Sequence, residues 1–233
     1  KKEFDLLLFL AKNKNRVLKR EEILDGVKTM GIGGHVRPDG DCVGSCMALY
    51  LYMKTWYPQI RTDIYLEKPK PVFGHIACMD EVHYETGEKK EYDLFVTCDV
   101  SALDRLAVAG DHYANAKKTV CIDHHISNEN GCGDVNYVIP TASSASELVY
   151  DVIRKEELDA EIAKALYIGI IHDTGVFQYS NTSPKTLQTA SHLISYGFDF
   201  PALISSTFYE KTYIQNQILG RALLESILFM DGR

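Results

Sequence analysis

The chain contains 233 residues, enough for one large domain with a substantial core. Apolar residues make up 45% and charged residues 24%, which excludes wholesale disorder, collagen-like repeats and coiled coil. The net charge of −7 argues against a broad basic face that holds duplex nucleic acid, but a nucleotide bound through metal ions remains compatible with it. No apolar run approaches the roughly 18 residues of a membrane span. Charges interrupt any signal-peptide core at the start, so we expect a cytoplasmic protein.

The predicted elements alternate between helices and strands. A strand-like run precedes His35, in the segment 32–36 that leads into an acidic turn, and further runs occur at 62–66, 93–98 and 119–122. Helical patterns occur at 3–12, 43–57, 145–154, 159–172, 184–196 and 213–229. An acidic turn, Arg37 to Asp41, precedes the second helix, and Asp159 is a suitable N-cap for the fourth. This alternation predicts an α/β fold with a mostly parallel sheet flanked by helices.

The cysteines predict neither structural zinc nor a disulfide framework. They show no CxxC spacing, and two of them fall inside strand-like runs, where a free thiol packs as a small apolar side chain. A reducing compartment fits this usage. The six are Cys42, Cys46, Cys78, Cys98, Cys121 and Cys132.

Acids and histidines stand where the predicted strands end. His35 follows the first run, Asp99 follows the third, and Asp123, His124 and His125 follow the fourth. Because the carboxyl ends of parallel strands meet at one edge of a sheet, these side chains are expected to converge there. Asp39 and Asp41 in the acidic turn and Asp173 at a helix end can join them.

Such a cluster favours bound cations. Asp39, Asp41, Asp99 and Asp173 would place four negative charges in one cleft, where each raises the pKa of the others. Two divalent ions would cancel that charge. Oxygen and imidazole donors without a thiolate suit Mn²⁺ or Mg²⁺ better than structural zinc, and imidazole favours Mn²⁺.

Each piece alone also has a simpler interpretation. The acidic turn is typical of a solvated loop, Asp99 of a helix N-cap, and the adjacent histidines of an exposed loop pair. Only the joint pattern at successive strand ends argues for a site. A structural role is expected for His75, His83, His112 and His192, whereas His172 is left open because it borders Asp173.

Four segments resemble the motifs of the DHH phosphoesterase superfamily. They are residues 34–45 (GHVRPDGDCVGS), 98–99 (CD), 122–125 (IDHH) and 172–175 (HDTG). Within it, the chain looks most like the bacterial NrnA-type oligoribonuclease and 3′-phosphoadenosine 5′-phosphate phosphatase, through residues 141–144 and 177–186. The resemblance runs from about Gly31 to the C-terminal helices.

The resemblance implies two manganese ions, with Mg²⁺ or Co²⁺ as possible substitutes. The first would be held by His35, Asp39 and Asp99. The second would be held by Asp41, Asp99, His124 and Asp173, so Asp99 bridges. His125 would face the substrate phosphate and Asp123 would orient a neighbouring histidine, which makes Asp99, Asp123 and His125 the implied catalytic residues.

Further substrate contacts are expected near these motifs. Gly44 and Ser45 are predicted to open the helix after the acidic turn, where backbone N–H groups can meet an anion. Arg105 and Lys185 are candidate phosphate contacts, although a solvated surface role fits each equally well.

The implied function is a manganese-dependent phosphoesterase acting on short RNA, linear or cyclic dinucleotides, or 3′-phosphoadenosine 5′-phosphate, with the choice between monoester and diester left open. Two alternatives are a manganese inorganic pyrophosphatase and a catalytically idle nucleotide-binding module. We expect a catalytic domain at 1–205 and a helical linker at 206–233. The linker would lead toward a substrate-binding domain that this chain lacks, and family members often pair as homodimers.

Overall fold

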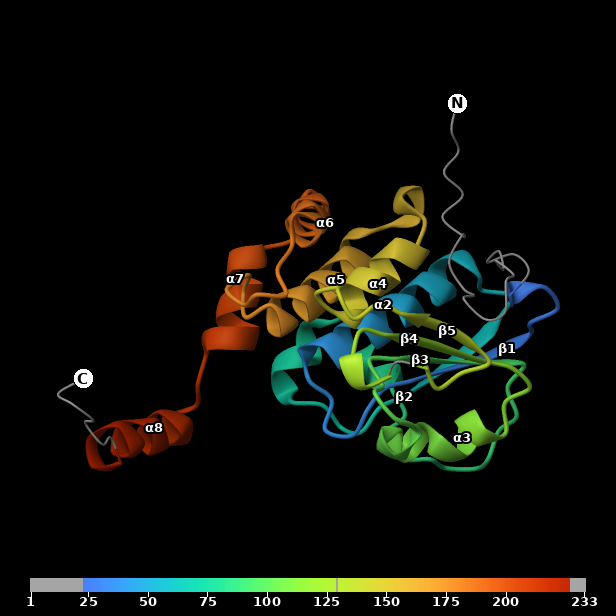
Figure 1. Cartoon of the computed structure of the whole chain (residues 1–233), viewed down its shortest axis with the longest axis horizontal. Coiled ribbons are helices and arrows are strands. Elements are labelled where there is room, and N and C mark those ends of the chain that lie inside the picture. Colours follow the sequence, from blue (N-terminus) through green and yellow to red (C-terminus); the bar gives the residue numbers. More distant parts are fainter. Residues whose placement is uncertain (1–22, 129, 227–233) are drawn as a thin grey trace.

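The computed structural model describes residues 23–128 and 130–226. A five-stranded parallel sheet in the order β2-β1-β3-β4-β5 forms the centre, with helices on both faces (Figure 1). The strands are β1 (Thr29–Gly33), β2 (Arg61–Tyr65), β3 (Leu94–Cys98), β4 (Thr119–Asp123) and β5 (Val135–Val138). The predicted α/β fold is confirmed.

Helices cover the sheet and continue away from it. Their bounds are α2 (Gly40–Trp56), α3 (Gly110–Ala114), α4 (Ala145–Val152), α5 (Ala160–Asp173), α6 (Pro184–Ile194), α7 (Phe200–Ile204) and α8 (Tyr213–Glu225). Short 3₁₀ turns lie at Pro71–His75, Met79–Glu81, Leu103–Arg105, Ala107–Ala109, Ile126–Asn128 and Lys155–Glu157, and a π turn lies at Ser205–Tyr209. The Asp159 side chain accepts from the Ile162 N–H, which confirms it as the N-cap of α5.

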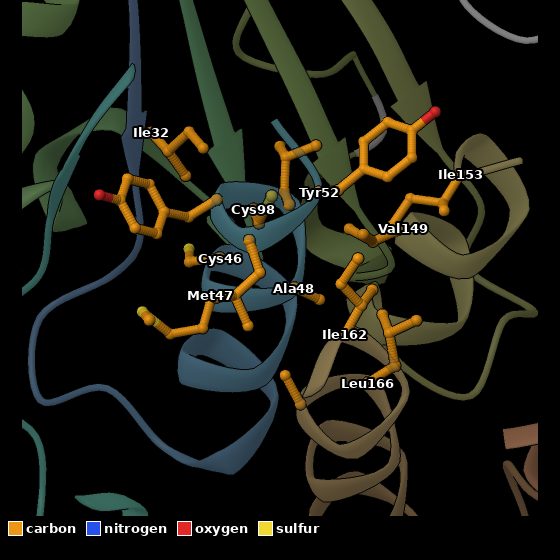
Figure 2. Packing of buried hydrophobic residues seen from close by; sticks show 14 of the residues in the cluster. Ile32, Cys46, Met47, Ala48, Tyr52, Cys98, Val149, Ile153, Ile162 and Leu166 are labelled. Carbon is orange, nitrogen blue, oxygen red and sulfur yellow. The ribbon is translucent and has the colours of Figure 1, made fainter. Parts of the chain in front are cut away.

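The main core lies between the sheet and α2, α4 and α5. Figure 2 shows Met47 and Ala48 of α2 between Ile32 of β1 and Ile162 of α5. All four of these side chains are fully buried. Burying each large aliphatic side chain contributes about 1.5–3 kcal/mol. This packing fixes the position of α2 relative to the sheet.

The opposite face of the sheet carries a smaller aromatic core. Phe95 of β3 packs there with Tyr92 and Tyr113, beside α3. A Cβ at Gly31 of β1 would lie 2.4 Å from the Phe95 ring, and one at Gly33 would lie 2.7 Å from the Ala109 Cβ. The small residues of β1 therefore make room for this aromatic layer.

The predicted strand before His35 is confirmed as β1, whereas other short elements were missed. After Gly33 the chain leaves the sheet, and the Val36 N–H donates to the Arg105 carbonyl. β5, α3 and α7 were not predicted, because helices of five residues are too short to show a helical period and only alternate residues of β5 are buried. The helix predicted at 3–12 lies outside the described residues.

The C-terminal helices lie to one side of the sheet, and α8 stands farthest from it (Figure 1). α8 exposes Tyr213, Ile214, Ile218 and Leu224. The division between a domain at 1–205 and a linker at 206–233 stays a prediction. Among the helices described in the two ranges, none combines the length and the apolar character needed to cross a membrane.

Candidate metal centre

The predicted acids and histidines gather at the carboxyl edge of the sheet. In the sheet, β2 lies on one side of β1 and β3 lies on the other. The chain therefore changes direction across the sheet between β1 and β3. Ligands of open α/β sheets bind at such a switch point. His35 lies two residues after β1, Asp99 directly after β3, and His124 directly after β4.

One half of the cluster centres on His35. Its Nε2 lies 3.3 Å from Asp99 Oδ2 and 3.8 Å from Asp39 Oδ1. Its Nδ1 lies 2.7 Å from the Val36 carbonyl oxygen, which can only accept, so Nδ1 carries the hydrogen. This contact leaves the Nε2 lone pair facing the carboxylates, as a metal-binding histidine requires.

The other half centres on His124. Its Nε2 lies 3.1 Å from Asp173 Oδ2, 3.4 Å from Asp99 Oδ1 and 3.7 Å from Asp41 Oδ2. Asp173 is the last residue of α5, and Asp41 lies in the first turn of α2. Two helix ends and the end of β3 therefore converge on an imidazole that itself stands at the end of β4.

Asp41 is held by the start of α4. It is fully buried, and its two oxygens accept from the backbone N–H groups of Ala145 at 2.6 Å and Ser146 at 2.9 Å. N–H groups in the first turn of a helix have no partner within that helix. α4 thus positions the Asp41 carboxylate against His124.

Asp99 joins the two halves and is strained. Its φ of 60° lies in the left-handed region, which is uncommon for a residue with a side chain and typical of functional sites. Asp99 Oδ1 is buried and makes no hydrogen bond within the described residues. A buried carboxylate oxygen left without a partner fits a bound cation, which would supply the missing contact.

The electrostatics of the cluster also call for positive charge. Burial, together with Asp99 and Asp173, raises the pKa of Asp41 well above its usual range. Burial opposes a charged His124, yet Asp173 and Asp99 raise its pKa to about 11. Burial likewise opposes a charged Asp99, but the neighbouring imidazoles of His124 and His35 hold its pKa below the usual range. Divalent cations would replace the imidazolium protons in neutralising the acids.

His125 lies beside the shared carboxylate, with its Nδ1 3.6 Å from Asp99 Oδ1, and Asp99, His124 and His125 can bring ligand atoms within 4.8 Å of one another. The His125 Nδ1 donates to Asp123 Oδ1 at 2.7 Å, and Asp123 Oδ2 accepts from Asn128 Nδ2 at 2.7 Å. Asp123 is fully buried, whereas the His125 side chain is 40% exposed. The Asp123 hydrogen bond raises the pKa of His125. Asn128 was not predicted, because nothing in its spacing marks it.

Residues 29–170 match the family model of the N-terminal domain of the DHH family. The chain belongs to the DHH family. The match begins at β1 and ends within α5. It therefore includes every residue of the histidine-carboxylate cluster except Asp173, which is the last residue of α5.

Relatives extend this DHH assignment. The chain is 34% identical over 182 residues to the bifunctional oligoribonuclease and PAP phosphatase NrnA of Bacillus subtilis, covering 76% of this chain and 56% of that protein. It is 35% identical over 179 residues to the probable Streptococcus mutans counterpart, covering 75% and 55%. The chain thus spans about half the length of the curated relatives it matches.

A solved structure shares the same fold. The crystal structure of an exopolyphosphatase-related protein from Bacteroides fragilis superposes with a TM-score of 0.77, at 22% identity. The match covers 87% of this chain and 62% of that one. At this identity, the likeness concerns the fold alone.

The expected anion site at Gly44 and Ser45 rests on a wrong helix boundary. The helix begins at Gly40, with Asp39 as N-cap, so both residues lie in its second turn. A Cβ at Gly44 would lie 2.6 Å from the Ala165 carbonyl, and Ser45 Oγ donates to the Asp41 carbonyl at 2.7 Å. Gly44 therefore serves the close approach of α2 and α5, and Ser45 is buried.

The two candidate phosphate cations have different surroundings. Arg105 is exposed, and its backbone carbonyl accepts from the Val36 N–H beside the histidine-carboxylate cluster. The Lys185 ammonium pairs with Asp151 at 2.5 Å and with Glu147 at 3.2 Å. These ion pairs give Lys185 a structural role on α6.

Three of the four histidines expected to be structural have partners, and the fourth, His75, is exposed. His112 Nε2 contacts the Thr86 carbonyl, His192 contacts Tyr150, and His83 lies beside Asp63. His172 packs edge-on against Phe73 and Phe208 behind the cluster. Burial lowers the pKa of His172 to about 4, so this ring is neutral.

Cys42 is a neighbour of the cluster that the predicted ligand set did not include. Its sulfur accepts from the His35 N–H at 3.2 Å, and His35, Cys42 and Asp99 can bring ligand atoms within 4.8 Å of one another. A Cβ at Gly34 would lie 2.3 Å from this sulfur, and burial raises the pKa of the thiol well above its usual range. The position of Cys42 thus suits a packed thiol supporting the His35 backbone.

Proposed function

We propose that this chain is the catalytic part of a manganese-dependent phosphoesterase that hydrolyses short oligoribonucleotides, linear or cyclic dinucleotides, or 3′-phosphoadenosine 5′-phosphate. The observation that carries the proposal is the pair of histidine-centred half-sites joined by the Asp99 carboxylate, whose buried Oδ1 makes no hydrogen bond within the described residues. The name of the Bacillus subtilis relative, an oligoribonuclease and PAP phosphatase, supports short oligoribonucleotides and 3′-phosphoadenosine 5′-phosphate as substrate classes.

The two half-sites suit two ions. His35, Asp39 and Asp99 would hold the first, and Asp41, Asp99, His124 and Asp173 the second, with Asp99 shared. When bound, such a pair holds phosphate oxygens and lowers the pKa of water, so that a nucleophile exists near neutral pH. The oxygen and imidazole donors favour Mn²⁺, with Mg²⁺ or Co²⁺ as substitutes.

His125 would act on the substrate directly. Its hydrogen bond to buried Asp123 fixes the ring and leaves Nε2 as the free end on a half-exposed side chain. A protonated Nε2 would donate to the negative charge that develops on a phosphate oxygen. Asp123 and Asn128 hold this imidazole in place, and so raise the fraction of protein that is ready to react.

Two other functions remain as outcomes of the test. A manganese inorganic pyrophosphatase would use a similar ligand set, although the acidic turn and residues 141–144 resemble the nuclease subgroup. A catalytically idle module would bind the nucleotide without turnover, but each predicted ligand type is present in the cluster.

One assay separates the three. The protein is stripped of metal, reloaded with Mn²⁺, and given pyrophosphate, 3′-phosphoadenosine 5′-phosphate or a diadenylate, with phosphate and nucleoside products measured. Turnover of the nucleotides over pyrophosphate is expected. Turnover of pyrophosphate alone would support the first alternative. Manganese-dependent nucleotide binding without products would support the second.

A further inference from the structure

One amide side chain joins two segments that build the His124 half of the metal centre. Asn181 lies between α5 and α6. Its Nδ2 donates to the Ser143 carbonyl at 2.9 Å and to the Asp173 carbonyl at 3.1 Å. Carbonyl oxygens only accept, so these contacts use both hydrogens of the amide. Asn181 therefore ties the backbone just before α4 to the last residue of α5.

Both of the tied segments contact the His124 half. Asp173 Oδ2 lies 3.1 Å from His124 Nε2. Two residues after Ser143, the Ala145 N–H donates to Asp41 Oδ2, which lies 3.7 Å from the same imidazole nitrogen. A shift of Ser143 relative to Asp173 would therefore change the spacing of two carboxylates around His124.

The loop between Asp173 and Asn181 has a strained backbone. Gly175, Val176 and Phe177 have φ angles of 56°, 55° and 66°, which lie in the left-handed region. This region is uncommon for a residue with a side chain, and a β-branched residue there is an outlier. Such a backbone persists only where the surrounding structure holds it. The contact of Asn181 with the Asp173 carbonyl closes this loop on the residue where it begins.

The hydrogen bonding of Asn181 is one-sided. Its Oδ1 is buried and makes no hydrogen bond within the described residues, and an unpaired buried acceptor destabilises a fold. Asn136, by contrast, uses both ends of its amide, since Nδ2 donates to the Gly133 carbonyl at 2.7 Å and Oδ1 accepts from the Gly133 N–H at 2.8 Å. The two carbonyl contacts of Asn181 thus serve more than the stability of its loop.

We propose that Asn181 is a positioning residue that sets the spacing of Asp41 and Asp173 and thereby strengthens cation binding in the His124 half. This role rests on the two-ion centre of the proposed function. Metal–ligand distances vary by only about 0.2 Å, so a small shift between the start of α4 and the end of α5 is enough to weaken an ion. Loss of a side chain that supports a metal ligand commonly lowers the metal affinity by about 10–100-fold.

Manganese titration of the folded protein, followed by calorimetry, tests this role without a substrate. Asn181→Ala should lower the affinity of one bound ion by about 10-fold and leave the other within about twofold. Asn181→Leu, which keeps the volume of the side chain, should do the same. Asn136→Ala is the matched control, because it also removes amide contacts with backbone groups, but at the start of β5, on the sheet edge opposite the metal centre. It should leave both affinities unchanged.

A double substitution shows which ion is affected. His124→Ala removes the imidazole on which Asp41 and Asp173 converge, so adding Asn181→Ala to it should leave the affinity of the remaining ion unchanged. Turnover gives a second measurement. The Mn²⁺ concentration for half-maximal turnover should rise by about 10-fold in Asn181→Ala, with the rate at saturating Mn²⁺ within about threefold of wild type. A merely structural role would lower the urea midpoint of unfolding without changing the manganese affinity of the folded protein.

Two results overturn the positioning role alone. One is wild-type affinity for both ions in folded Asn181→Ala or Asn181→Leu. The other is an equal loss of affinity when Asn181→Ala is added to His124→Ala, because the effect would then not pass through the His124 half. A wild-type protein that binds no manganese would refute the two-ion centre itself, and with it this role, so the first titration distinguishes the two failures.

Discussion

Asp39 and Asp41 are two residues apart in sequence, yet they belong to differently built halves of the cluster. The Asp39 side chain is 57% exposed and caps its own helix by accepting from the N–H groups of Asp41 and Cys42. Asp41 is fully buried and is held by Ala145 and Ser146, more than 100 residues away. We call the His35 half local, because Asp39 is held within its own turn, and the His124 half tertiary, because Asp41 is held only when distant segments pack.

The pKa values of the two carboxyls show the consequence. Burial works against ionisation of Asp39, but hydrogen bonds from His35 and the Cys42 backbone hold its pKa below the usual value. Asp41 sits deeper and faces Asp99 and Asp173, so its pKa is raised. The tertiary half therefore depends more strongly on a bound cation than the local half does.

Removing the shared carboxylate should have the largest effect, because both halves use it. Asp99→Asn keeps the size of the side chain but removes the charge, and we expect turnover to fall by about 10³-fold or more. Asp104→Asn, an exposed neighbour, is the control. Turnover of Asp99→Asn near that of the wild type in Mn²⁺ would refute the two-ion assignment.

The adjacent histidines should separate metal binding from substrate contact. His124→Ala should weaken manganese binding in the tertiary half by about 100-fold, and excess Mn²⁺ should partly rescue turnover. His125→Ala should lower turnover by about 100-fold with the manganese content unchanged. Elemental analysis of both variants checks this, and equal metal loss would show that the two roles are misassigned.

Gly40 lies between the two carboxylates in sequence, and substituting it tests how closely the start of α2 packs against His172. A Cβ there would lie 2.2 Å from the His172 ring, so Gly40→Ala should destabilise the fold by about 1–3 kcal/mol, measured by urea unfolding. Gly110 also begins a helix but has nothing within 4 Å of its Cβ direction, so Gly110→Ala should be neutral or stabilising. Equal stability of the two variants would mean that His172 moves aside freely.

The smallest effect is expected on the local half. Asn is as good an N-cap as Asp, so Asp39→Asn should change the unfolding free energy of the metal-free protein by a few tenths of a kcal/mol, whereas Asp39→Ala should cost about 1 kcal/mol. Urea unfolding with a chelator present measures both. A much larger cost for the Asn variant would show that the charge itself holds this turn.

The sheet and the histidine-carboxylate cluster were predictable because they leave signals in short stretches of sequence. Residues 94–98 and 119–123 are compact apolar runs followed by an acid or a histidine, and Asp159 precedes an apolar-periodic helix. β5 gave no such signal, since only alternate residues of this short edge strand are buried. The first turn of α2 was mistaken for loop because Gly40 and Asp41 are weak helix formers, and packing against His172 and α4 outweighs that preference.

Sequence alone therefore determined the order of the elements and the side chains that stand at strand ends, because hydrophobic periodicity and helix caps act within a few residues. Only the tertiary structure decided that Asp41 is buried while Asp39 is exposed, and that Asn128 supports Asp123. Those relations depend on hydrogen bonds and burial between segments that meet only when the sheet and helices pack. The chemistry of each side chain was readable in advance, but its neighbours were not.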